Sequence, residues 1–354
     1  MLRLPGLIDP HVHMREPGAT HKENWMTGTA AALAGGFTAV LAMPNTAPPV
    51  TDAESLAQTL ALASQKAHCD YAQYVGAGAE NASSLTKLAD QAAGLKLYLD
   101  QTYGPLRLTD HASWVKHFEN WPQDKPLCIH AEADTLAAAL KLAEEMKRPV
   151  HFCHVSRKKE IQLIRAAKER GAPITCEVTP HHLFLTEANS AAIGAGRSEV
   201  RPRLASAADQ QALWDNLDVI DCFASDHAPH TLAEKDGANP PPGFPGLETA
   251  LPLYLTALNH DLLCFEELID LCFTNPKRIF DLPDQPDTWV EVDETTVWTI
   301  HAAGLHSRAG WTPFEGRQVQ GKVNRVVLRG TEVFKHGHVL SEPGFGRDLR
   351  AIIQ

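Results

Sequence analysis

Short apolar runs alternate with amphipathic stretches along most of this chain. The apolar runs are residues 6–13, 38–44, 71–76, 94–99, 127–130, 150–155, 174–179 and 219–225. Apolar residues between the runs have helical spacing, as in two examples: Leu56, Leu60, Leu62 and Ala63, and Ile161, Leu163, Ile164 and Ala167. The second example stops at Gly171, a typical helix end. Eight strand–helix pairs predict an α/β fold, a (β/α)8 TIM-like barrel.

The pattern changes near residue 288 to Val, Thr and Trp separated by turn residues, as in residues 289–293 and 323–330. This composition is typical of short strands and predicts a small β-rich appendage. The opening residues 2–4 could add a strand to it. We therefore expect a barrel over residues 5–285, and a flanking β-rich domain made of residues 1–4 and 286–354.

Composition narrows the function classes. The chain has 354 residues, 44% of them apolar, and a formal net charge of -11, which argues against nucleic acid or an anionic membrane as partner. It has no apolar run of about 20 residues and no pattern of a secretory signal, so a cytoplasmic protein is expected. Seven cysteines, an odd number placed mostly in apolar segments, favour reduced and buried thiols.

Residues that can bind a metal stand at the ends of the apolar runs, the side where a barrel of this kind builds its active site. They are His11, His13, Lys96, His130, His154 and Asp226. His11 and His13 share one face of a strand, because side chains alternate with a period of two. A single histidine is more often a hydrogen-bonded core residue, and Asp226 alone could cap a helix. Their occurrence at five strand ends predicts a metal site.

Lys96 lies in the apolar segment at residues 94–98. A buried ammonium group is costly unless it is neutralised or paired. One interpretation is a side chain that extends to the surface. The functional interpretation is an amine that has reacted with carbon dioxide to give a carbamate, whose oxygens can bridge two divalent ions.

Nine motifs, which together run from residue 5 almost to the C-terminus, resemble one family. They are PGLIDPHVHMREPG at 5–18, AMPNT at 42–46, GLKLY at 94–98, IHAE at 129–132, HFCHV at 151–155, TCEVTPHHL at 175–183, CFASDHAPH at 222–230, PPPGFPGLE at 240–248 and WTPFEG at 311–316. The sequence resembles the amidohydrolase superfamily and, within it, most closely the CAD-type dihydroorotase domains of the animal multifunctional pyrimidine enzymes.

The resemblance implies a binuclear zinc site. His11 and His13 with Asp226 would hold one Zn²⁺, His130 and His154 the other, and N6-carboxylated Lys96 would bridge them. The implied reaction is the reversible cyclisation of N-carbamoyl-L-aspartate to L-dihydroorotate in de novo pyrimidine biosynthesis, a cyclic amide hydrolase activity. In it a metal-bridging hydroxide attacks the ring amide while Asp226 carries the proton.

Arg15 lies two residues beyond the metal pair and offers a planar fork for a carboxylate. An ion pair on the surface is the alternative. The resemblance assigns six residues to the substrate, three to its carboxylate and three near its ring: Arg15, Asn45 and His230, then Arg201, Pro242 and Gly243.

Residues 100–105 follow the strand that carries Lys96, and Gly104 and Pro105 mark them as a loop. Loops on this side of a barrel commonly act as lids. The resembling loop presents Thr and Phe to the substrate, and Thr102 and Tyr103 stand here, so this chain departs from the family by one hydroxyl. An exposed turn without a role is the alternative.

Two further positions, Cys153 and Glu177, fall at strand ends, where CAD-type enzymes suggest an additional zinc. A buried cysteine that packs as a small hydrophobic side chain is the alternative.

Other activities stay open at this point. A hydantoinase or an allantoinase shares the metal ligands, and Arg15, Asn45 and His230 favour a substrate with a carboxylate instead. A catalytically inactive dihydroorotase-like assembly subunit is a second alternative, and the complete ligand set argues against it. The resemblance also implies a homodimer and association with other enzymes of the pyrimidine pathway.

Overall fold

A ring of short parallel strands forms the centre of the molecule. The computed structural model describes residues 1–351. The strands are β2 (Leu7–Val12), β3 (Phe37–Ala42), β4 (Asp70–Gln73), β5 (Val75–Gly76), β6 (Leu95–Tyr98), β7 (Leu127–His130), β8 (Val150–Phe152), β9 (Ile174–Val178) and β10 (Cys222–Phe223). One parallel sheet has the order β2-β3-β4 and another the order β10-β9-β8-β7-β6-β5.

Main-chain contacts connect these two sheets at both ends. Only Tyr74 separates β4 from β5, so the two behave as one strand that pairs with both sheets. Past β10, His227 forms a parallel bridge with Val12, and its carbonyl accepts the N–H of His13 at 2.8 Å. The strand order is that of the predicted (β/α)8 barrel, and all eight apolar runs contain a strand. The strand β10 is shorter than the apolar run at 219–225, because Val219 belongs to the 3₁₀ turn η3 (Leu217–Val219).

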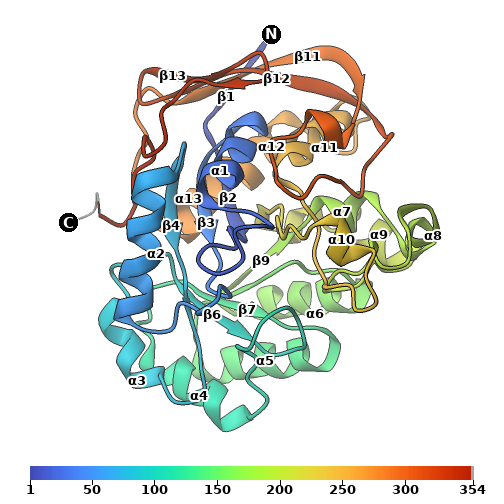
Figure 1. Ribbon diagram of the computed structural model, residues 1–354. Coiled ribbons are helices and arrows are strands. Elements are labelled where there is room, and N and C mark those ends of the chain that lie inside the picture. The colour runs from blue at the N-terminus through green and yellow to red at the C-terminus, as the bar shows by residue number, and fades with distance from the viewer. Residues whose placement is uncertain (352–354) are drawn as a thin grey trace.

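Helices cover the outside of the ring (Figure 1). The longer ones are α1 (Trp25–Ala34), α2 (Ala53–Lys66), α4 (His111–Asn120), α5 (Ala133–Met146), α6 (Lys158–Glu169), α9 (Ala207–Trp214) and α11 (Leu247–Asn259). Short segments are α3 (Ala82–Leu85), η1 (Thr86–Leu88), α7 (Pro180–Phe184), η2 (Glu187–Asn189), α8 (Ser190–Ile193), α10 (Leu232–Lys235), α12 (Phe265–Ile269), the π-helical η4 (Asp270–Thr274), α13 (Asn275–Ile279) and η5 (Ala302–Gly304).

The helical spacing in the sequence corresponds to buried faces. In α6, Ile161, Ile164 and Ala167 are buried, and Gly171 follows the helix end with φ +83°, a left-handed conformation that glycine adopts without strain. Strands β2, β3, β4, β6, β7 and β8 are buried along their whole length, as expected of parallel strands covered on both faces.

A five-stranded antiparallel sheet lies at one end of the barrel, drawn at the top of Figure 1. Its order is β1 (Leu2–Pro5), β11 (Trp289–Thr299), β12 (Gln318–Leu328), β13 (Thr331–Lys335) and β14 (His338–Val339). Leu2 pairs with Val292, which confirms that the N-terminal residues add a strand to the β-rich appendage. After β14 the chain returns to the barrel, where Arg350 donates hydrogen bonds to the carbonyls of Phe280 and Ala93.

All seven cysteines are free thiols, and only Cys264 is exposed. Within residues 1–351, no helix is both long and apolar enough to cross a membrane.

One turn of the appendage is fixed to the barrel by a buried carboxylate. Glu248, in the first turn of α11, accepts hydrogen bonds from the N–H of His306 at 2.8 Å, from His306 Nδ1 at 2.9 Å and from the N–H of Ser307 at 3.1 Å. The bond to Glu248 raises the pKa of His306 above its ordinary value of 6.5, because it outweighs the opposing effect of burial.

This pair predicts a pH-dependent stability. A raised pKa in the folded state means that the His306 contribution is fully present below about pH 6.5 and is lost as the pH rises through the raised value. His306→Asn should therefore lower the unfolding temperature more at about pH 6 than at about pH 9. Thermal unfolding of both proteins at the two pH values measures this. An equal difference at both values would contradict the assignment.

Candidate active site

The predicted site residues converge at the carboxyl ends of the barrel strands. They line one cavity together with Tyr98 and Ala228: His11, His13, Arg15, Asn45, Thr102, Tyr103, His130, His154, Arg201, Asp226, Pro242 and Gly243. Lys96, His230, Cys153 and Glu177 are buried directly around it. Parallel strands bring these distant segments together, because all their carboxyl ends lie on one side.

His11, His13 and Asp226 form the first group that could hold an ion, with ligand atoms within 4.8 Å of one another. Oδ1 of Asp226 lies 3.3 Å from His11 Nε2 and 3.1 Å from His13 Nε2. The Nδ1 protons are donated elsewhere, from His13 to Asn45 at 2.7 Å and from His11 to Glu177. Both Nε2 atoms are thereby left as acceptors, the arrangement that metal-binding histidines use. Burial lowers the pKa of both histidines and favours this neutral form.

His130 and His154 form the second group. Nδ1 of His130 and Nε2 of His154 face each other at 2.9 Å. The other ring nitrogens are buried and have no hydrogen-bond partner within residues 1–351. Burial and then the neighbouring His130 lower the pKa of His154 well below its ordinary value. Two imidazole nitrogens that face each other at this distance suit a shared divalent ion.

Lys96 is completely buried between the two groups, so the alternative that it extends to the surface is wrong. Its Nζ donates to Cys153 Sγ at 2.7 Å and lies 5.3 Å from the ring centre of Tyr98. No carboxylate among the described residues pairs with it. An amine in this setting is suited to conversion into a carbamate, because the conversion replaces a buried cation by ligand oxygens.

Cys153 and Glu177 lie on the opposite side of His11, and the three ligand atoms are within 4.8 Å of one another. Burial raises the pKa of the Cys153 thiol. Burial also raises the pKa of Glu177, but His11 and then His151 more than offset this and hold it well below its usual range. Glu177 is therefore an ionised acceptor whose partners here are two histidines.

Backbone strain concentrates at this rim. Arg15, His154 and Asp226 have φ values of 56°, 35° and 44°, in a region that residues with a side chain rarely adopt. Such strain persists only where surrounding contacts hold it, and it is common at functional sites. Burial raises the pKa of the Asp226 carboxyl, so this group is poised closer to neutrality than an ordinary aspartate.

Arg15 and His230 form the part of the cavity that suits an anion. Arg15 Nε donates to the carbonyl of Pro229 at 3.1 Å, and Nη1 is buried without a partner within residues 1–351. His230 Nδ1 accepts from Lys22 at 3.1 Å, and its Nε2 donates to the carbonyl of Pro242 at 3.0 Å. Nη2 of Arg15 lies 3.1 Å from that same Nε2. Two donors side by side favour an anionic ligand.

Tyr103 covers the part of the cavity beside Arg15 and His230. Its ring lies 5.0 Å from that of His230 and 4.9 Å from the guanidinium carbon of Arg15. Asn45 donates to its carbonyl at 2.9 Å, and Lys22 donates to its hydroxyl at 3.2 Å. The space enclosed is about 20 Å³, enough for about one water molecule. A larger ligand therefore requires some of the lining side chains to move.

Sequence reasoning missed Lys22, Tyr98 and Lys235. The buried Lys235 donates to the carbonyls of Glu199, Pro241 and Gly243 and so fixes the loop that reaches the cavity, while burial lowers its pKa to about 7. No strand-end position marks these lysines, and they are recognisable only from their partners.

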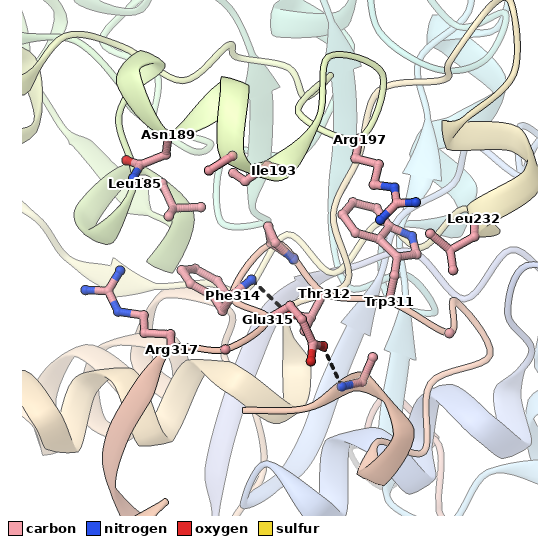
Figure 2. Close-up of a pocket in the computed structure, with 15 residues that line it drawn as sticks. Leu185, Asn189, Ile193, Arg197, Leu232, Trp311, Thr312, Phe314, Glu315 and Arg317 are labelled. Carbon is pink, nitrogen blue, oxygen red and sulfur yellow. Dashed lines mark hydrogen bonds between the residues drawn. The ribbon is translucent and has the colours of Figure 1, made fainter. Parts of the chain in front are cut away.

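The motif at residues 311–316 lines a separate cavity of about 630 Å³, shown in Figure 2 between Arg197 and Arg317. Its link to the site is Trp311, whose indole N–H donates to the carbonyl of His230 at 2.8 Å.

Comparison with known proteins assigns the chain to a family. The family described as Dihydro-orotase-like matches residues 1–104. The multifunctional protein CAD of Squalus acanthias is 53% identical over 351 residues, which cover 99% of this chain and 16% of that protein. The dihydroorotase of Pyrococcus abyssi is 38% identical over 357 residues, covering 96% of this chain and 85% of the relative. The chain thus spans about a sixth of the multifunctional relative.

Solved structures have the same fold. The L-hydantoinase of Arthrobacter aurescens superimposes with a TM-score of 0.93 at 25% identity, over 98% of this chain and 88% of that one. An inactive dihydroorotase-like domain of a Chaetomium thermophilum CAD-like protein gives 0.84 at 28% identity, over 98% and 99%. The fold is that of the metal-dependent cyclic amidohydrolases. Within that class, the chain belongs to the dihydroorotase family.

The contacts of Tyr103 predict how the loop behaves. Tyr103→Ala removes the ring over Arg15 and the bond from Lys22, so residues 100–105 should exchange their amide hydrogens faster. Tyr103→Phe, the matched control, removes only the hydroxyl and should raise exchange less. Hydrogen exchange read by mass spectrometry distinguishes the three proteins. Identical exchange in all three would show that Tyr103 does not hold the loop closed.

Proposed function

We propose that this chain is a dihydroorotase that interconverts N-carbamoyl-L-aspartate and L-dihydroorotate in pyrimidine biosynthesis. One observation carries the proposal: two pairs of histidines and the unpartnered donor of Arg15 line one cavity, and Lys96 is buried beside it. The membership of the chain in the dihydroorotase family supports the same substrate.

The donor set fits two zinc ions. His11, His13 and Asp226 would hold one ion, His130 and His154 the other, and Lys96 as a carbamate would bridge them. The carbamate forms when the neutral amine adds to carbon dioxide and releases one proton. When bound, the ions polarise the ring amide carbonyl and lower the pKa of water.

Asp226 is the proton carrier in this proposal. Its carboxyl is buried, its pKa is raised by burial, and Oδ1 faces the two histidines of the first group. In ring opening it would receive the proton of the attacking water and deliver it to the leaving ring nitrogen. Ring closure uses the same carboxyl in the opposite order.

The chain also supplies side chains that would bind the substrate. Arg15, Asn45 and His230 would bind its carboxylate, for which Arg15 Nη1 provides a free donor. Arg201, Pro242 and Gly243 would lie along the ring. Thr102 would donate a hydrogen bond to the ligand while Tyr103 covers it, which places both in the catalytic loop and excludes water from the closed site.

Hydantoinase activity is the second candidate, because the L-hydantoinase of Arthrobacter aurescens has the same fold. An inactive assembly subunit is the third. Zinc-loaded protein should be offered dihydroorotate, N-carbamoyl-L-aspartate, hydantoin and allantoin in parallel. We expect turnover of the first two alone. Turnover of hydantoin or allantoin alone would support another amidohydrolase, and no turnover with two ions bound would support an inactive subunit.

A third ion at His11, Cys153 and Glu177 is an extension of the proposal. It would replace the proton that His11 Nδ1 donates to Glu177.

We further propose that residues 5–285 act as the catalytic unit, with residues 1–4 and 286–354 as a flanking domain. By analogy with the family, the chain would form a homodimer and act alongside other pyrimidine-pathway enzymes. Light scattering after size exclusion tests the dimer.

Lys96→Ala should bind fewer than two ions and lose nearly all activity, because no other anion can bridge the groups. Lys235→Met is the matched control for metal content, since it also removes a buried lysine but one whose hydrogen bonds all go to carbonyls. Metal content by mass spectrometry with dihydroorotate turnover measures both variants. Two ions and full turnover in Lys96→Ala would remove the carbamate from the account.

Asp226→Asn should lower kcat by at least about a hundredfold and change substrate affinity less, because a proton carrier acts in the transition state. Arg15→Lys provides the contrast, since it keeps the charge but loses the fork and should raise KM. Steady-state kinetics in both directions at full metal occupancy separates the two effects. A raised KM with preserved kcat in Asp226→Asn would make it a binding residue.

A further inference from the structure

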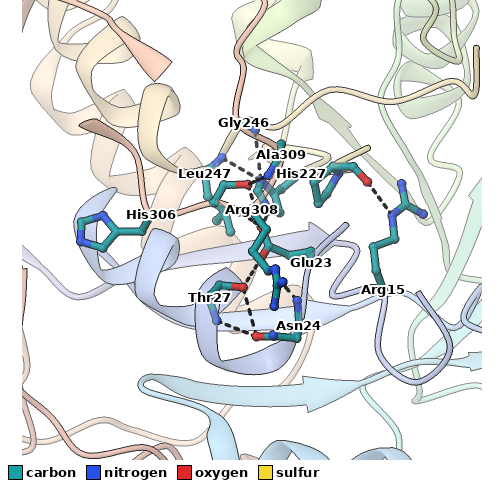
Figure 3. A network of polar contacts seen from close by, with 12 residues as sticks. Arg15, Glu23, Asn24, Thr27, His227, Gly246, Leu247, His306, Arg308 and Ala309 are labelled. Carbon is teal, nitrogen blue, oxygen red and sulfur yellow. Dashed lines mark hydrogen bonds and ion pairs between the residues drawn. The ribbon is translucent and has the colours of Figure 1, made fainter. Parts of the chain in front are cut away.

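We propose that Glu23 is a positioning residue: through the side chain of His227 it fixes the main chain on which Asp226 stands. The proposal rests on the role given to Asp226 above. It concerns residues outside the cavity, and it connects the active site to one turn of the β-rich appendage (Figure 3).

Glu23 is a completely buried carboxylate whose partners are all donors. Oε1 accepts from the hydroxyl of Thr27 and from the N–H of Asn24 at 3.3 Å. Oε2 accepts from the hydroxyl of Ser307 at 2.7 Å and from the N–H of Arg308 at 3.3 Å. His227 Nε2 completes the set at 3.3 Å from Oε2. The carboxylate therefore joins the start of α1, the appendage and the segment after β10.

The ring of His227 is fixed in one tautomer. Nδ1 accepts the N–H of Gly246 at 3.1 Å, so the proton resides on Nε2 and is directed at Glu23. The main chain of His227 is fixed too, because its carbonyl accepts the N–H of His13 at 2.8 Å and its N–H donates to Ser225 Oγ at 3.0 Å. His227 thus connects Glu23 to the strand that carries a metal-ligand candidate.

Asp226 stands between two such anchors in a strained conformation, with φ 44°. On one side, the N–H of Ser225 donates to both oxygens of Asp9 at 3.2 Å. On the other side stands His227, held by Glu23. An aspartate keeps a left-handed backbone conformation only where surrounding contacts hold it. The loss of one anchor should therefore let the backbone of Asp226 change and its carboxyl turn away from His11 and His13.

Glu248 offers a matched control. It is also a buried carboxylate, and it accepts three hydrogen bonds from His306 and Ser307 in the same appendage turn. No hydrogen bond within residues 1–351 joins it to His227. Loss of either carboxylate should loosen the appendage, but only loss of Glu23 should disturb Asp226.

The test compares Glu23→Gln with Glu248→Gln in the full chain. In Glu23→Gln an amide N–H₂ group faces donors, so His227 is released. We expect kcat to fall at least about tenfold with KM within about threefold, and zinc affinity to weaken about tenfold, as for other residues that orient metal ligands. Glu248→Gln should keep kcat and zinc affinity within about twofold. Zinc affinity is measured by competition with a chelator, and thermal unfolding shows whether both variants are folded.

Equal losses of kcat and zinc affinity in the two variants would overturn the proposal and leave Glu23 as an anchor of the appendage. If Glu23→Gln does not fold, Ser307→Ala takes its place, because it removes one donor and keeps the carboxylate. It should lower kcat about threefold, and an unchanged kcat with unchanged zinc affinity would overturn the proposal. A wild-type protein inactive on dihydroorotate would instead reject the proposed function, while the zinc measurement would still test the positioning.

Discussion

The complete burial of Lys96 is the constraint on which the rest of the site depends. An ammonium group removed from water and without a carboxylate partner is costly, and the contact that Lys96 makes with Cys153 does not neutralise it. The arrangement becomes favourable once the lysine carries an anion and the imidazoles share cations with it. On our proposal, carbon dioxide and zinc are therefore part of the folded state of this rim and not late additions to it.

The need to keep the histidines able to bind a metal also explains why they are paired with polar side chains around the cavity. Asn45 and Glu177 each accept a hydrogen bond from Nδ1 of one histidine, which leaves Nε2 of that histidine as an acceptor. Arg15, His154 and Asp226 have strained backbone conformations and direct their side chains into the cavity. The conformational energy of this strain must be offset by other contacts. On our proposal, the hydrogen bond between Glu23 and His227 helps to hold Asp226 in this conformation. Glu23 is itself held by Ser307 and Arg308 of the appendage. The small sheet would then support catalysis without touching substrate.

The barrel and the convergence of the candidate metal ligands at one rim were predictable because they follow periodic rules. A strand buried on both faces gives an apolar run, and a polar residue at its end faces one rim, so His11, His13 and His130 could be recognised by their shared position at strand ends and not one by one. The resemblance added Asn45, His230 and the roles of Thr102 and Tyr103 in the loop at residues 100–105. Glu23 meets Ser307 across 284 positions, and Lys22 meets Tyr103 only after the loop folds back. No local pattern encodes such contacts. Positive φ at Asp226 was equally hidden, because the sequence there is compatible with an ordinary turn.

The most direct test is to look for the carbamate carbon itself. Protein purified without metal should be reloaded with zinc in ¹³C-labelled bicarbonate and examined by ¹³C NMR. Our account predicts one carbamate signal per chain that appears with zinc, disappears on chelation and is absent from Lys96→Ala. A fully active enzyme with two zinc ions and no carbamate signal would contradict it.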